Sequence, residues 1–180
     1  VGKLYNGLDR MRKLLIRIYS GIGNWRKCKI TSSEAFEKAN NFIYKLSQME
    51  SFYEELCLIG NNKKIPNGNI LAKYSPYIDQ NKVLRSNSRL NEMDFLQEAI
   101  KRPIILMGKN KLTKLIVLEL HWQNEHIMSR RLTLKSIHEK YIVVGLTKLV
   151  KYISSHCVEC KKLRDVPSNQ LMAPLHDRLG

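Results

Sequence analysis

The sequence predicts a mainly α-helical protein with a small β component, an α+β fold of 180 residues. Near both ends of the chain, apolar residues recur every three or four positions, which is the period of one helical face. Between residues 71 and 108 the apolar pieces are short and are bounded by Pro, Gly, Asp and Asn, as strands and turns are. With 43% apolar residues the chain can build a core.

A first helix is expected within residues 1–29, and Gly21 and Gly23 should end it. Its apolar face carries Leu8, Met11, Leu15 and Ile18, and its other side carries Arg10, Arg12, Lys13 and Arg17. The basic side could face DNA or a membrane surface, although a solvated face is the commoner meaning of such a pattern.

Thr31 and Glu34 form a capping-box pattern, so a second helix should begin there. The turn residues Gly60, Asn61 and Asn62 should end it. Between these limits an apolar stripe at helical spacing is expected to pack in the core: Phe36, Ala39, Ile43, Leu46, Tyr53 and Leu56.

Two strand regions should follow, a hairpin turning at Asp79-Gln80-Asn81 and a strand within residues 102–108. A helix is then predicted over residues 112–120. A second one, capped by Thr133, should carry Leu134, Ile137 and Tyr141 and end at Gly145. A last helix bears Leu146, Leu149, Val150 and Ile153.

The chain carries 31 Lys and Arg against 16 Asp and Glu, a net charge of +15, which makes a polyanion the leading partner. The excess lies at the two ends of the chain, around a neutral middle. A basic surface that only confers solubility is the alternative. No apolar run approaches 18 residues, so we expect a soluble, intracellular protein without a membrane span. The start at Val1 and the linker-like residues 167–180 suggest a piece of a longer polyprotein.

Four residues have the chemistry and the spacing of a metal site: His121, His126, Cys157 and Cys160, in the order His-x4-His-x30-Cys-x2-Cys. A Cys-x2-Cys turn lets both sulfurs approach one ion, and structural zinc prefers four tetrahedral nitrogen and thiolate ligands. Two histidines five residues apart lie about 140° apart on a helix, so the helix should end near His121. The sequence therefore predicts one structural zinc ion.

Each half of this pattern has ordinary explanations when taken alone. A Cys-x2-Cys pair can be coincidence or a redox pair, although this pair does not open a helix after a strand as a thioredoxin-like motif does. Catalytic zinc is disfavoured because four protein ligands leave no open position for water. His156 could compete as a ligand, and His138 is expected on a helix surface. Cys28 and Cys57 are expected to be ordinary apolar residues or free thiols.

The ligands, together with Thr133-Leu134, Tyr141, Gly145 and Cys157-Val158-Glu159-Cys160, resemble the zinc-binding amino-terminal domain of retroelement integrases, particularly those of BEL/Pao long-terminal-repeat retrotransposons. The stretches FIYKLSQMESFYEEL, SPYIDQNKVLRSNSRL and KRPIILMGKNKLTKLI resemble, in order, the family's sequence before that domain. The resemblance covers about residues 30–178. The chain departs from the family at residues 85–90, where family glycines are missing, at His126-Ile127-Met128, before Thr133, and at Tyr141-Ile142. These changes leave the ligands intact but suggest a diverged copy that has lost activity.

We expect a basic helix and linker over 1–29 from the residue pattern. Beyond it, the resemblance implies a mixed pre-integrase region over 30–108, a zinc-binding helical module over 109–166 and a linker over 167–180 to a catalytic core outside this sequence. It implies a non-catalytic module that binds element-end DNA and helps integrase to multimerise, in the nucleus or in virus-like particles. The candidate DNA contacts are cations on helices, which suit phosphate binding: Arg130, Arg131, Lys135, Lys161, Lys162 and Arg164.

Two other functions compete with this hypothesis. A host protein derived from such an element could keep the zinc fold as a protein-interaction scaffold. Alternatively, residues 1–110 could hold an enzyme, but they offer no nucleophile with a base, no phosphate-binding loop and no clustered acids.

Overall fold

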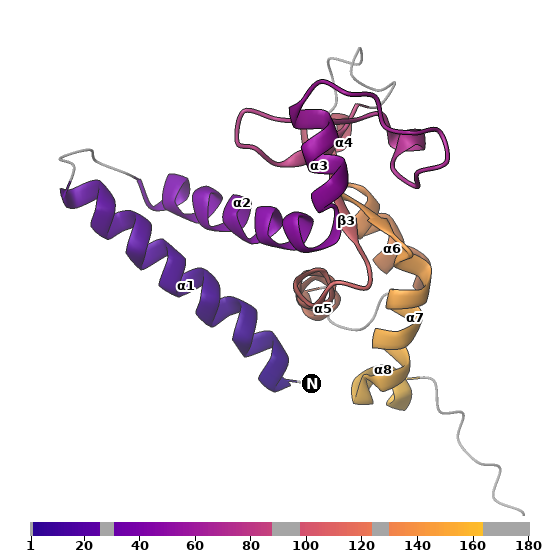
Figure 1. Cartoon of the computed structure of the whole chain (residues 1–180). Helices are drawn as coiled ribbons and strands as arrows, with labels where there is room; N and C mark the ends of the chain where they lie inside the picture. Colours follow the sequence, from indigo (N-terminus) through magenta and orange to yellow (C-terminus); the bar gives the residue numbers. More distant parts are fainter. Residues whose placement is uncertain (1, 26–30, 88–97, 124–129, 164–180) are drawn as a thin grey trace, which may run out of the picture.

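The computed structural model describes residues 2–25, 31–87, 98–123 and 130–163, and it confirms a mainly helical fold with a small sheet (Figure 1). The helices are α1 (Gly2–Trp25), α2 (Ser32–Ser51), α3 (Tyr53–Gly60), the 3-10 turn η1 (Ala72–Tyr74), α4 (Glu98–Lys101), α5 (Lys111–Gln123), α6 (Arg130–His138), α7 (Leu146–His156) and α8 (Val158–Lys162). The strands are β1 (Pro76–Ile78), β2 (Leu84–Ser86), β3 (Ile104–Met107) and β4 (Tyr141–Val144).

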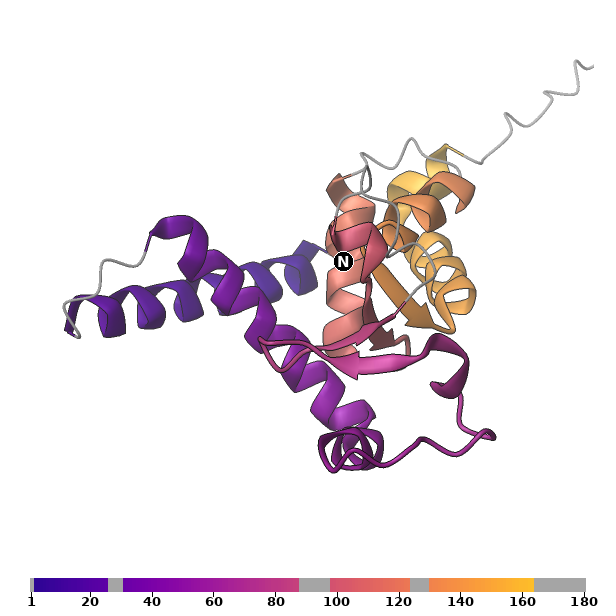
Figure 2. The same cartoon turned by 90° about the horizontal axis from the view of Figure 1, so that it is seen from above.

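Helices α1 and α2 pack against each other, and the end of α1 and the start of α2 project from the rest of the fold (Figures 1 and 2). The expected stop at Gly21 and Gly23 is wrong, because α1 continues to Trp25. A glycine inside a helix costs about 1 kcal/mol relative to alanine, and packing against a neighbouring helix can offset that cost.

The predicted capping box at the start of α2 is confirmed. Thr31 Oγ1 accepts from the Glu34 amide, and the Glu34 carboxylate accepts from the Thr31 amide. The predicted long helix is divided, however, because the chain leaves helical geometry at Phe52, whose ψ is 34°. Phe52 itself is buried and starts a change of direction into α3.

The predicted core stripe of α2 is only partly right. Ala39 and Ile43 are buried, but the side chains of Phe36, Leu46 and Tyr53 are exposed. The buried face instead follows Ala35, Ala39, Ile43, Ser47 and Gln48. Small and polar residues on this face let α2 approach α1, α5 and β3 closely, and a search for large apolar residues misses them.

The four strands pair in the order β1-β2-β3-β4. The predicted hairpin is confirmed as the antiparallel pair β1–β2, in which Tyr77 lies opposite Arg85. Strand β2 pairs antiparallel with β3, and β3 pairs parallel with β4, with Ile104 opposite Tyr141. Helices α5 and α6 form the crossover between the two parallel strands, as parallel pairing requires.

Strand β4 corrects the sequence analysis, which assigned Tyr141 to a helix. α6 ends at His138, and residues 141–144, Tyr-Ile-Val-Val, lie in the sheet, since β-branched and aromatic residues favour strands. The helix also begins at Arg130, before the expected cap at Thr133. The ends of β3 and β4 meet at Gly108, where an added Cβ would lie 2.8 Å from the Val144 carbonyl oxygen.

Alternating strand residues face two clusters of buried side chains, as the period of a strand dictates. Ile104, Leu106, Tyr141 and Val143 pack with residues of α1, α5 and α7. Leu84, Ile105 and Ile142 pack with Phe52, Leu71 and side chains of α3 on the other face. Because β3 and β4 pair, residues 30–108 and 109–166 share one sheet.

A buried glutamine, Gln48 of α2, joins the helical layer to the sheet. Its amide nitrogen donates to the carbonyl oxygens of Leu84, at 2.9 Å, and Ile105, at 2.8 Å. Its oxygen accepts from the Leu84 amide at 2.8 Å. Gln48 therefore satisfies backbone groups of β2 and β3 where these strands have only one paired position, Arg85 with Ile104.

Candidate metal centre

His121 lies in the last turn of α5, a helix that packs against α1, α2, α6 and α7. Thr113, Val117 and His121 are spaced four residues apart and are all buried, so the imidazole continues the buried face of the helix. His121 is only 5% exposed. The structure describes α5 as far as Gln123, two residues beyond His121.

The two cysteines lie at the corner between α7 and α8. α7 ends at His156, Cys157 takes an extended conformation with φ −82° and ψ 125°, and α8 begins at Val158. The Lys161 amide donates to the Cys157 carbonyl oxygen at 3.1 Å, which closes the first turn. Residues three apart in such a turn lie on one side, so both sulfurs face inward, and Cys157 and Cys160 are 2% and 9% exposed.

His121, Cys157 and Cys160 form a group that could hold a metal ion. One ligand atom of each residue lies within 4.8 Å of those of the other two, and the distance between His121 Nε2 and Cys160 Sγ is 3.3 Å. Around a tetrahedral ion with metal–sulfur bonds of about 2.3 Å, neighbouring ligand atoms are roughly 3.5–3.8 Å apart. The three side chains therefore need only small movements to surround one ion.

The other residues predicted for the site have different positions. His156 is exposed, and its Nδ1 lies 2.8 Å from the Tyr152 carbonyl oxygen and 3.1 Å from Ser155 Oγ, outside the metal-ligating group. His138 is exposed at the end of α6, as expected. The predicted fourth ligand, His126, lies outside the described residues.

The candidate DNA contacts fall on two elements, α6 and α8. Lys135 is exposed on α6, and Lys161 and Lys162 are exposed on α8, where Lys162 pairs with Glu159 at 3.3 Å. Arg130 and Arg131 belong to the first turn of α6, and the structure does not describe their side chains. Arg164 lies outside the described residues.

A polar network that the sequence did not predict involves α5, the helix that carries His121. Arg12 of α1 donates from both terminal nitrogens to the Glu119 carboxylate of α5, at 2.7 and 2.8 Å, and from Nε to Asn40 of α2 at 2.8 Å. This hydrogen bond to Glu119 is the main cause that raises the pKa of Arg12 above its ordinary value. The sequence holds one indication that Arg12 is partly buried, because it follows Leu8 by four residues and so lies near the apolar face of α1.

Two tyrosines line the same hollow as Arg12 and Glu119 and form a hydrogen-bonded pair of their own. The hydroxyl groups of Tyr44 and Tyr141 are 2.8 Å apart, and their rings meet edge to face with centroids 5.8 Å apart. Burial raises the pKa of both phenols, and the hydrogen bond between them partly opposes this rise at Tyr44. The Arg12 bonds join α1 to α2 and to α5, two residues before His121, and the tyrosine pair joins α2 to β4.

Within the described part of the chain, no helix is both long enough and apolar enough to cross a membrane. Comparison with known protein families, curated proteins and solved structures finds no match to this chain.

Proposed function

We propose that the chain is a zinc-stabilised, non-catalytic module in which His121, Cys157 and Cys160, together with His126, hold one structural zinc ion. The single observation that carries the proposal is the convergence of three buried ligand atoms from two distant segments within 4.8 Å. One imidazole and two thiolates suit zinc better than magnesium or calcium, which prefer oxygen ligands. A zinc ion bound there would link the end of α5 to the α7–α8 corner.

The proposed role of the module is that of the amino-terminal region of a retrotransposon integrase, contributing to binding of element-end DNA and to self-association in the nucleus or in virus-like particles. The order and spacing of the ligands and the motif resemblance over residues 30–178 support this role. The charge of +15 and the exposed cations Lys135, Lys161 and Lys162 favour a phosphate-rich partner.

Metal content tests the first part of the proposal. Elemental analysis of the purified protein should give about one zinc per chain, and chelation should reduce the helical circular dichroism signal because structural zinc contributes folding free energy. A chain without zinc, whose helices are indifferent to the chelator, would contradict the ligand assignment.

Charge reversal tests the second part. Arg130, Arg131 and Lys135 changed together to Glu should weaken binding of duplex DNA and flatten its dependence on salt, since fewer counterions are released. Lys63, Lys64 and Lys73, exposed and without predicted DNA contacts, changed together to Glu provide a control with the same change in net charge. Unchanged binding in a filter assay would refute the assignment.

A further inference from the structure

Three basic residues distant in sequence gather at one end of the sheet because of the strand register. Arg85 of β2 lies opposite Ile104 of β3, and Ile104 lies opposite Tyr141 of β4. Arg102 shortly precedes Ile104, and Lys140 directly precedes Tyr141. The antiparallel pairing of β2 and the parallel pairing of β4 therefore bring one cation from each strand region to the same edge.

Two hollows meet at this edge. One, of about 490 Å³, lies between the β1–β2 hairpin and Arg102. The other, of about 430 Å³, lies between α2 and the sheet, with Lys140 in its wall. Both are lined by Asn81 and Arg85, so together they form one groove, which we name the sheet-end groove.

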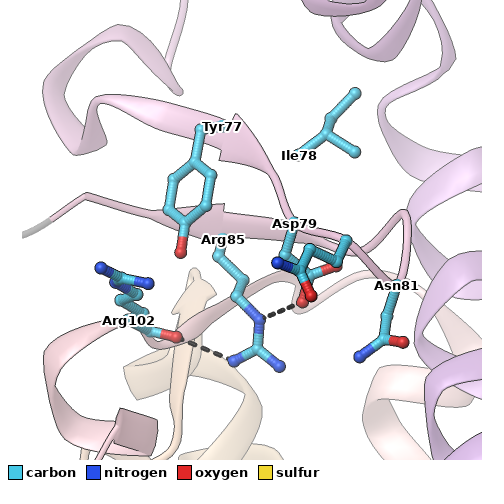
Figure 3. Close-up of a pocket in the computed structure, with 7 residues that line it drawn as sticks. Tyr77, Ile78, Asp79, Asn81, Arg85 and Arg102 are labelled. Carbon is cyan, nitrogen blue, oxygen red and sulfur yellow. Dashed lines mark hydrogen bonds and ion pairs between the residues drawn. The ribbon is translucent and has the colours of Figure 1, made fainter.

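The groove presents cationic groups with hydrogen-bonding capacity left over. Arg85 donates through Nε to Asp79 at 2.6 Å and through Nη1 to the Arg102 carbonyl oxygen at 2.9 Å (Figure 3). Its Nη2 group has no bond to another described residue. The Lys140 side chain is exposed and, among the described residues, pairs with no carboxylate. Asp79 is already engaged by Arg85 and by the Val83 amide, and Glu37 is the other carboxylate in the wall, so three cations face two acids there.

Aromatic rings and amides complete the groove. The Tyr77 ring stands above Arg85 and Arg102 in the first hollow (Figure 3), and Phe36 and Tyr44 line the second. Asn81, whose side-chain amide makes no bond to other described residues, projects where the two hollows meet. Rings stack on unpaired bases, amides bond base edges, and cations follow the phosphates.

We infer that the sheet-end groove binds single-stranded nucleic acid, with Arg85, Arg102 and Lys140 at the phosphates and a base in each hollow. Duplex DNA fits this surface less well, because its bases are stacked inside and its backbone suits exposed helices such as α6 more than a walled groove. The inference does not rest on the proposed function, which concerns duplex DNA and cations on α6 and α8.

The test is fluorescence anisotropy of the full chain with a labelled oligothymidylate of about 12 nucleotides, a length within the range bound by single-strand modules. Lys140→Ala should lower the slope of log affinity against log salt by about 0.7, the value for one lost phosphate contact on a single strand. Asn81→Asp, which adds charge at almost unchanged volume, should weaken binding at every salt concentration.

Lys64→Ala and Asn67→Asp are matched controls, because both residues are exposed and line a different hollow, near the end of α3. Circular dichroism melting of each variant checks that it folds. Weaker binding in the Lys140 and Asn81 variants alone, with unlabelled single strands competing better than duplex, supports the inference. Equal losses in the control variants, equal competition by duplex, or no detectable binding to oligothymidylate overturns it.

Uracil-containing and ribonucleotide strands of the same length then separate DNA from RNA as the preferred ligand. Charge reversal of Arg130, Arg131 and Lys135 serves as the cross-check. If the two surfaces are separate, it weakens duplex binding and leaves oligothymidylate affinity near that of the Lys64 control, whereas Lys140→Ala does the reverse. If both variants lose affinity for duplex DNA and for oligothymidylate to the same extent, the groove is not a separate binding surface.

Discussion

The ion pair between Arg12 and Glu119 should be the strongest single polar link between α1 and the rest of the fold. Both terminal nitrogens of Arg12 meet the carboxylate, at 2.7 and 2.8 Å, and the two side chains are only 13% and 15% exposed. Removing one partner of a buried pair leaves an uncompensated charge and costs about 3–5 kcal/mol. Because some exposure remains, Glu119→Ala should lower the free energy of unfolding by about 3 kcal/mol.

A double-mutant cycle measured by urea unfolding in zinc-containing buffer isolates the pair. The Arg12→Ala, Glu119→Ala and double variants should give a coupling energy of about 2–3 kcal/mol, since two charge-assisted hydrogen bonds are lost together. The same helix supplies the control, Asp9 with Lys13, whose side chains are 40% and 68% exposed. Exposed pairs of this spacing contribute about 0.3–0.5 kcal/mol. A coupling at Arg12–Glu119 no larger than that of the control pair would refute the reasoning.

Three further outcomes are expected. Cys160→Ser should lower bound zinc, measured by elemental analysis, by at least tenfold at equal free metal, because the hydroxyl is a poorer ligand than the thiolate; full zinc occupancy would exclude Cys160 as a ligand. Gln48→Leu should destabilise the fold by about 2–4 kcal/mol in urea unfolding, since three buried backbone groups lose their partner, and a loss under 0.5 kcal/mol would contradict the role assigned to Gln48. Because folding raises the pKa of Tyr44 and Tyr141, the two neutral phenols stabilise the folded state fully below about pH 10, the ordinary tyrosine pKa. Above that pH the phenols ionise more readily in the unfolded chain, so this contribution to the free energy of unfolding is lost. The double change of both tyrosines to Phe should therefore reduce the loss of stability between pH 10 and 11.5 in urea titrations, and an unchanged pH dependence would argue against it.

Local signals in the sequence were enough to predict much of the fold. The capping box at Thr31 and Glu34 involves atoms three residues apart, and the hairpin around residues 79–81 depends on a turn between neighbouring strands. Strand β3 has Pro and Gly at its ends, which mark its limits. Such elements are set by residues close in sequence, so a single sequence contains their cause.

Elements set by distant partners were harder to predict. Tyr141 continues the helical spacing of Leu134 and Ile137, and what makes residues 141–144 a strand is the exposed edge of β3, far earlier in the chain. The interruption at Phe52 likewise depends on the pocket that buries its ring, formed with Leu71 and Leu84. The spacing of apolar residues along the chain carries no information about such contacts between distant residues.

The residues of the candidate site also divide into those set by local sequence and those set by distant contacts. The Cys-x2-Cys turn is local, and His121 at a helix end could be predicted from spacing, so the three residues that meet were all named from the sequence. The network around Arg12 could not be predicted, because its two partners, Asn40 and Glu119, come from α2 and α5 and only folding brings them together. Which surface cations contact a ligand also depends on tertiary arrangement, as the sheet-end groove illustrates.

The parallel pairing of β3 with β4 has a consequence for synthesis of the chain on the ribosome. At about 5–20 residues per second, roughly 40 residues separate the appearance of β3 from that of its partner, a delay of about 2–8 s. During this interval the apolar edge of Ile104, Ile105 and Leu106 is a template for pairing with other chains. Chaperone occupancy of nascent chains should therefore peak before β4 emerges, and a product truncated near residue 120 should aggregate while the full chain does not.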